Sequence, residues 1–271
     1  MKLPIGIQLY SVRTDLEADF EGTLKKLKAL GYDGVEFAGL YGNSPEKIAS
    51  LLGEIGLAPA GAHVGIAEMR SDMKKVVADY KAIGCKDIAV PWLGEDDRPG
   101  GKNYENTVKD IRKFAEMAAD AGITMSYHNH DFEFVKDGHG VYGFDKLYED
   151  IPENLLKTEQ DTCWVAVAGE NPAKYLKKYK GRCPLVHLKD YFGEKTEGMY
   201  GLIGGGLPRD NLTGFEYRPL GKGVQDIKSI CEAAIEADAS WFIVEQDEPS
   251  MGLSRMECAE ISINYLKSLG Y

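Results

Sequence analysis

Short apolar runs alternate along the chain with longer stretches in which apolar residues recur at helical spacing. A short apolar run bounded by turn residues is typical of a buried strand, and a repeat of three to four residues is typical of an amphipathic helix. Eight runs are predicted to be strands, and a helical stretch follows each of them. The eight runs are Ile5–Tyr10, Gly34–Phe37, Ala58–His63, Asp87–Val90, Thr124–His130, Leu156–Asp161, Pro184–Lys189 and Trp241–Glu245.

This alternation of strands and helices predicts a parallel sheet covered by helices. Eight strand–helix units are what a closed (β/α)8 TIM barrel requires, and about 250 residues is the usual length of that fold. A doubly wound open sheet would alternate in the same way, but no glycine-rich dinucleotide fingerprint follows the first strand. We therefore expect one α/β domain over residues 1–271, a TIM barrel.

The segment Tyr191–Gly223 interrupts the alternation, because it is rich in glycine and lacks periodicity. It follows the seventh strand, at the carboxyl end where TIM barrels carry their active sites. Loops of this length in compact domains are usually functional or disordered. We expect a lid over the site or a contact in a homo-oligomer; the alternative is a surface excursion without a role.

The charge and cysteine content of the chain limit the kinds of molecule that it is expected to bind. The chain has 32 Lys and Arg residues against 43 Asp and Glu residues, a net charge of −11. Such a surface repels phosphate backbones and anionic lipid, so we expect no nucleic-acid and no membrane partner. The five cysteines are scattered without a CxxC pair, which favours reduced thiols and a cytoplasmic protein.

Side chains capable of metal binding or proton transfer concentrate where the apolar runs end. These residues are Glu36, His63, His128, His130, Glu133, Asp161, His187 and Glu245. In a parallel barrel the carboxyl ends of the strands meet at one mouth, so these side chains are expected to converge. Carboxylates and imidazoles without cysteine suit one divalent cation, such as Mn²⁺, Mg²⁺, Co²⁺ or Zn²⁺.

Each of these residues could instead have a purely structural role. His63 is a ligand, a substrate contact or a hydrogen-bonded barrel histidine, and Glu36 could pair with a neighbouring cation. Asp161 could cap the next helix, and His187 could be a structural core histidine. Glu245 is the hardest to explain structurally, because a carboxylate that ends an apolar strand costs free energy unless it is paired or metal-bound.

Several motifs together resemble the xylose isomerase-like TIM barrels. This sugar phosphate isomerase/epimerase family also includes ketose 3-epimerases, inosose dehydratase and endonuclease IV. The motifs are Tyr127–His130, Glu133–Phe134, Asp161–Val165, Val186–Asp190, Pro219–Gly223 and Val244–Glu245.

The resemblance implies a metal held by a Glu, an Asp, a His and a second Glu at the ends of four strands. Matching motifs assign the last three ligands to Asp161, His187 and Glu245. For the first ligand we predict Glu133, with His128 on the fifth strand itself as the alternative.

A divalent ion bound to a carbonyl and an adjacent hydroxyl acidifies the neighbouring C–H bond and stabilises an enediolate. We predict His130 or His128 as the base that removes the proton, since an imidazole pKa lies near the working pH. Lys189, which shares a strand face with His187, is the predicted proton donor; a salt bridge with Asp190 is the alternative.

Trp164 and Trp92 are predicted to offer apolar faces to a sugar ring, with His63 and Glu36 as further substrate contacts; core packing is the alternative for both tryptophans. The predicted function is a metal-dependent isomerase or epimerase of a sugar or keto-sugar. The alternative is a lyase or dehydratase acting on a keto-sugar or inosose by β-elimination, including 3-keto-glycoside cleavage. An endonuclease IV-like phosphodiesterase fits the acidic chain less well, and a non-catalytic sugar-binding barrel is the third class.

Overall fold

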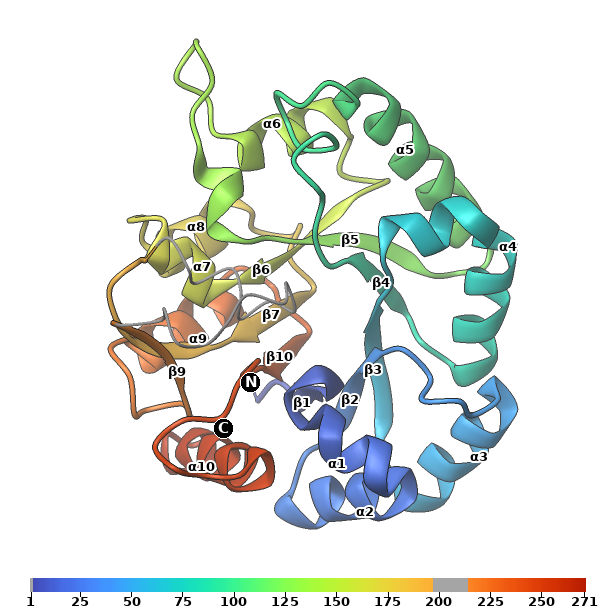
Figure 1. The fold of residues 1–271 in the computed structure, drawn as a ribbon, viewed down its shortest axis with the longest axis vertical. Coiled ribbons are helices and arrows are strands. Elements are labelled where there is room, and N and C mark those ends of the chain that lie inside the picture. Colours follow the sequence, from blue (N-terminus) through green and yellow to red (C-terminus); the bar gives the residue numbers. More distant parts are fainter. Residues whose placement is uncertain (1, 197–213) are drawn as a thin grey trace.

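The computed structural model describes residues 2–196 and 214–271, and its parallel strands close into a barrel (Figure 1). Neighbouring strands follow one another in chain order, and β10 pairs with β1 to close the ring. The barrel strands are β1 Ile5–Gln8, β2 Gly34–Ala38, β3 Ala58–His63, β4 Asp87–Val90, β5 Thr124–His128, β6 Lys157–Asp161, β7 Leu185–Leu188 and β10 Trp241–Val244. The prediction of a TIM barrel is confirmed.

Helices surround the barrel on its outside (Figure 1). They are α2 Phe20–Leu30, α3 Pro45–Ile55, α4 Ile66–Ile83, α5 Tyr104–Asp120, α6 Gly143–Asp150, α8 Pro172–Lys178, α9 Ile227–Glu236 and α10 Arg255–Ser268. The short helices α1 Arg13–Ala18 and α7 Thr162–Val167 were not predicted, since each has too few residues for a periodic pattern. Among the described helices, none combines the length and apolar character needed to cross a bilayer.

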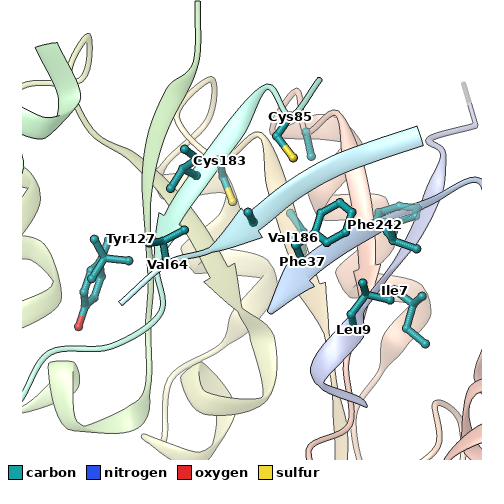
Figure 2. Close-up of a cluster of buried hydrophobic side chains, with 14 of the residues drawn as sticks. Ile7, Leu9, Phe37, Val64, Cys85, Tyr127, Cys183, Val186 and Phe242 are labelled. Carbon is teal, nitrogen blue, oxygen red and sulfur yellow. The ribbon is translucent and has the colours of Figure 1, made fainter. Parts of the chain in front are cut away.

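Hydrophobic side chains pack outside the barrel and in its interior, and polar side chains occupy its mouth. The outward faces of the strands contribute to the main hydrophobic cluster, which includes Ile7, Phe37 and Phe242 (Figure 2). Inside the barrel, Ala60, Leu185 and Ile243 form a separate cluster against Trp241. Because side chains alternate along a strand, the inward residues nearer the carboxyl ends lie above this cluster and face the mouth.

The segment Tyr191–Gly223 has strands at both of its ends. β8 Asp190–Gly193 pairs antiparallel with β9 Phe215–Arg218. The Asp190 carboxylate accepts hydrogen bonds from the backbone N–H groups of Gly221 and Gly223, both at 3.0 Å, which holds the end of the segment against β7. Residues 197–213, on which the predicted lid or subunit contact mainly falls, lie outside the described residues.

Candidate metal centre and active site

A pocket of about 250 Å³ opens at the carboxyl ends of the strands. Its walls come from widely separated parts of the chain, namely Tyr10, Ala38, His63, Pro91, Trp92, His128, His130, Lys189, Glu245 and Asp247. Six residues singled out from the sequence therefore share this pocket, as strand-end convergence predicts.

Four buried side chains at the base of the pocket could hold a divalent ion. His128, Asp161, His187 and Glu245 each offer one ligand atom, and these atoms lie within 4.8 Å of one another. His187 Nδ1 lies 3.0 Å from Glu245 Oε2, and His128 Nε2 lies 3.6 Å from Asp161 Oδ2. Two imidazoles and two carboxylates form a mixed nitrogen and oxygen set that suits a divalent cation.

Asp161 caps a helix and also belongs to the four-residue group. Its Oδ1 accepts hydrogen bonds from the backbone N–H groups of Cys163 at 2.8 Å and Trp164 at 3.1 Å, and so caps α7. Its Oδ2 faces the site, 2.9 Å from Lys189 Nζ. The cap fixes the carboxylate orientation, because one oxygen is held by backbone while the other points toward the proposed ion.

Glu133 is not part of the four-residue group. Its carboxylate accepts hydrogen bonds from the Tyr127 hydroxyl and from the backbone N–H of His130, the latter at 2.7 Å. Tyr127 belongs to the outer hydrophobic core, since it alternates with the inward-facing His128 on β5. The structure thus places Glu133 on the helix side of the strand, where burial raises its pKa to about 8. The alternative first ligand, His128, is the one that lies among the others.

A second pair of carboxylates lies beneath the histidines. Glu159 Oε1 lies 2.5 Å from His63 Nε2 and 3.2 Å from His128 Nδ1, and Glu36 Oε2 lies 2.8 Å from His187 Nε2. Glu36, predicted as a substrate contact, is fully buried and does not line the pocket. Glu159 was missed, although its position two residues before Asp161 places it on the same strand face.

Lys189 lies among three carboxylates. Its Nζ is 2.9 Å from Asp161, 2.8 Å from Glu245 and 2.9 Å from Asp247. Burial alone would lower the lysine pKa, but these carboxylates raise it well above its ordinary value. The predicted alternative, a salt bridge with Asp190, is not formed, since Asp190 accepts backbone N–H groups instead. Asp247 was also missed, two residues beyond Glu245.

His130 offers an uncharged imidazole to the pocket. Burial lowers its pKa well below the ordinary value, and the nearby His128 and Lys189 add to this effect. Within the described residues, its Nδ1 has no hydrogen-bond partner. Its ring stacks on Phe132 with centroids 5.0 Å apart, and the Arg98 guanidinium covers Phe132. This stacking orients a neutral base candidate.

The two tryptophans predicted to contact substrate differ in position. Trp92 lines the pocket and is 50% exposed, so it is available to a ligand. Trp164 is fully buried and packs against Phe215 and Tyr217, so the structure gives it the core role that was its alternative. His63 lines the pocket and also contacts Glu159.

Comparison with known proteins agrees with this fold. The family described as "Xylose isomerase-like TIM barrel" matches residues 24–269. An inosose dehydratase of Clostridium botulinum (strain Alaska E43 / Type E3) is 24% identical over 93% of this chain and 90% of its own length.

Two solved structures have the same fold. A sugar phosphate isomerase/epimerase from Parabacteroides distasonis superposes with a TM-score of 0.78 at 18% identity, over 99% of this chain and 94% of its own. A probable 3-DHS dehydratase from Bacillus anthracis superposes with a TM-score of 0.75 at 13% identity, over 98% of this chain and 99% of its own.

Proposed function

Since the chain belongs to the xylose isomerase-like TIM barrel family, we propose that it is a divalent-metal-dependent enzyme that removes a proton beside the carbonyl group of a keto-sugar or inosose. The observation that carries the proposal is one pocket lined by a neutral imidazole, His130, by the buried ammonium group of Lys189, and by His128 and Glu245, two members of the four-residue group with Asp161 and His187. Epimerases and dehydratases are both represented among the similar proteins.

Different residues of the chain would take different roles in such a reaction. When bound, a divalent ion polarises the substrate carbonyl and acidifies the neighbouring C–H bond. His130 lines the pocket, and burial lowers its pKa and keeps the ring neutral, so it is the base that takes the proton. Lys189, held by Asp161, Glu245 and Asp247, carries the protons that can be given to a departing or negatively charged oxygen. Trp92, which lines the pocket, would cover the apolar face of the substrate's sugar ring.

The outcome that the geometry supports best is β-elimination, the alternative of the sequence analysis. The resemblance implies a glutamate as the first metal ligand, and this chain has His128 at that position on the fifth strand. One imidazole base and one ammonium donor instead suit removal of a proton and protonation of a leaving oxygen. The inosose dehydratase relatives support this choice.

Isomerisation or epimerisation is the second candidate. Both begin with the same proton removal by His130. Isomerisation returns a proton to the neighbouring carbon, and epimerisation returns one to the same carbon on its opposite face. They differ from elimination only in whether an oxygen leaves. The product therefore distinguishes them.

The test is a substrate screen in D₂O with protein loaded separately with Mn²⁺, Co²⁺, Mg²⁺ or Zn²⁺. Ketoses, inososes and 3-keto-glycosides are incubated with each form, and products are followed by NMR. We expect loss of water or of the glycosidic group together with loss of the hydrogen from the carbon beside the carbonyl, which becomes part of a double bond. Deuterium then enters at the carbon that lost the oxygen when the enol product ketonises. Deuterium in a product of unchanged composition would indicate isomerisation or epimerisation. Sugar binding without turnover would favour a non-catalytic barrel.

A further inference from the structure

Both histidines of the four-residue group have their second ring nitrogen against a buried carboxylate. His128 Nδ1 lies 3.2 Å from Glu159 Oε1. His187 Nε2 lies 2.8 Å from Glu36 Oε2 and 3.2 Å from Glu159 Oε1. Glu36 and Glu159 are completely buried, so water does not compete for these contacts.

An ionised carboxylate only accepts hydrogen bonds, whereas a neutral imidazole has one donor and one acceptor nitrogen. A ring nitrogen that faces Glu36 or Glu159 therefore carries the hydrogen, and the opposite nitrogen carries the lone pair. His128 Nε2 and His187 Nδ1 face the carboxylates of Asp161 and Glu245, and with an ion between these nitrogens and those carboxylates the two nitrogens carry the lone pairs. Both lone pairs point into the same group.

We propose that Glu36 and Glu159 are positioning residues, which hold His128 protonated at Nδ1 and His187 protonated at Nε2 and so present His128 Nε2 and His187 Nδ1 to the metal. This inference rests on the proposed function, because it takes the four-residue group as the metal site. Carboxylates that accept the second N–H of a ligating histidine fix its orientation and raise its basicity.

The proposal also chooses between two possible metal positions. His63, His128, Glu159 and His187 form a second set whose ligand atoms likewise lie within 4.8 Å of one another. An ion there would need His128 Nδ1 and His187 Nε2, the nitrogens that face the carboxylates. Protonation of those nitrogens excludes this second set and leaves the set that includes Asp161 and Glu245.

The contacts predict that the two carboxylates affect different sets of histidines. Glu159 lies against both ligating histidines, whereas Glu36 contacts only His187 of the two. Gln8 Nε2 donates to Glu36 Oε2 at 2.9 Å and so holds Glu36 in place. Loss of Glu159 should therefore disturb both imidazoles, and loss of Glu36 should disturb one.

The first test needs no variant. The full chain is labelled with ¹⁵N-histidine and loaded with diamagnetic Zn²⁺, and correlations between ring nitrogens and carbon-bound ring protons identify the protonated nitrogen of each histidine. We expect Nδ1–H at His128 and Nε2–H at His187. The opposite protonation at either residue would overturn the inference while leaving the proposed function standing. Wild-type protein that binds no divalent ion would overturn both.

The second test compares variants of the same shape as the native residue. Glu159→Gln should weaken Zn²⁺ binding about 10–100-fold, measured by competition with a chromophoric chelator. Glu159→Gln should also change the protonated ring nitrogen of both His128 and His187, whereas Glu36→Gln should change that of His187 but not that of His128. Asp87→Asn is the matched control, because the Asp87 carboxylate is buried on β4 and accepts from Ser126 Oγ at 3.0 Å.

We expect Asp87→Asn to keep wild-type affinity and histidine spectra. Wild-type affinity and spectra in both Glu36→Gln and Glu159→Gln would show that these carboxylates do not position the histidines. Complete loss of Zn²⁺ from folded Glu159→Gln would also overturn the inference. It would make Glu159 a direct ligand, in the second set with His63, His128 and His187.

Discussion

His187 Nδ1 lies 3.0 Å from Glu245 Oε2, although 58 positions separate the two residues in the chain. β7 and β10 are adjacent parallel strands, and Val244 pairs with Leu188 in their register. The inward side chains near the ends of the two strands are thereby brought together. Two of the proposed metal ligands therefore come from neighbouring strands of the barrel.

Removal of either member of this contact is predicted to abolish metal binding. His187→Ala and Glu245→Gln each remove one of four ligands and leave an open coordination position. Metal content of protein purified without chelators and then soaked in Mn²⁺ or Zn²⁺ should be about one ion per chain in the wild type and near zero in both variants.

Glu133→Gln is the matched control for this experiment. Glu133 is buried and lies near His130 in the chain, but its carboxylate binds Tyr127 and a backbone N–H group instead of the four-residue group. We expect it to keep its metal. Loss of metal from Glu133→Gln with retention in His128→Asn would restore Glu133 as the first ligand.

His130→Asn is predicted to keep the metal and lose most activity, because it removes the base without touching a ligand. Removal of a general base costs about 10²–10⁴-fold in turnover. Turnover and metal content should be measured on the same sample. His139→Asn, at an exposed histidine of the same region, should match the wild type in both. Full turnover in His130→Asn would assign the base to another residue.

Lys189→Met is predicted to destabilise the metal-free protein strongly. It leaves the carboxylates of Asp161, Glu245 and Asp247 close together without their ammonium partner. Breaking a buried ion pair in this way costs about 3–5 kcal/mol. Denaturant unfolding should show this loss, and saturating Mn²⁺ should recover part of it because the cation supplies positive charge. An equal loss with and without Mn²⁺ would argue against metal binding at these carboxylates.

Asp97 is predicted to make stability depend on pH outside the site. Its hydrogen bonds with Arg70, Thr107 and Asn103 lower its pKa to about 2. A carboxyl group with a folded pKa below the unfolded value of about 3.9 stabilises the protein above that value, and this contribution disappears as pH falls through the folded pKa.

The measurement compares wild type with Asp97→Asn by urea unfolding between pH 7 and pH 3. We expect the variant to be less stable by about 1–3 kcal/mol at pH 7, the range for hydrogen bonds to charged groups, with the difference shrinking below about pH 4. Asp96→Asn, at a neighbouring exposed residue that forms a surface ion pair with Lys102, should show little change. A difference that stays constant down to pH 3 would contradict the argument.

Local pattern was enough to predict the barrel and most of its polar mouth. Apolar runs such as Trp241–Val244 and helix signals such as Ser44 before Pro45 depend on neighbouring residues only, and both appear in the structure as expected. His187 and Glu245 were identified in the same way, because a polar side chain that ends an apolar strand stands out from its surroundings.

The choice between Glu133 and His128 needed the tertiary structure. It depends on the turn Asp131–Phe134, which carries Glu133 to the Tyr127 hydroxyl on the outer side of β5. The burial of Trp164 and the exposure of Trp92 likewise depend on which distant segments cover each ring. Strand alternation decides which face a side chain takes, but the partner that meets it there comes from another strand, and only closure of the barrel brings that partner within hydrogen-bond distance.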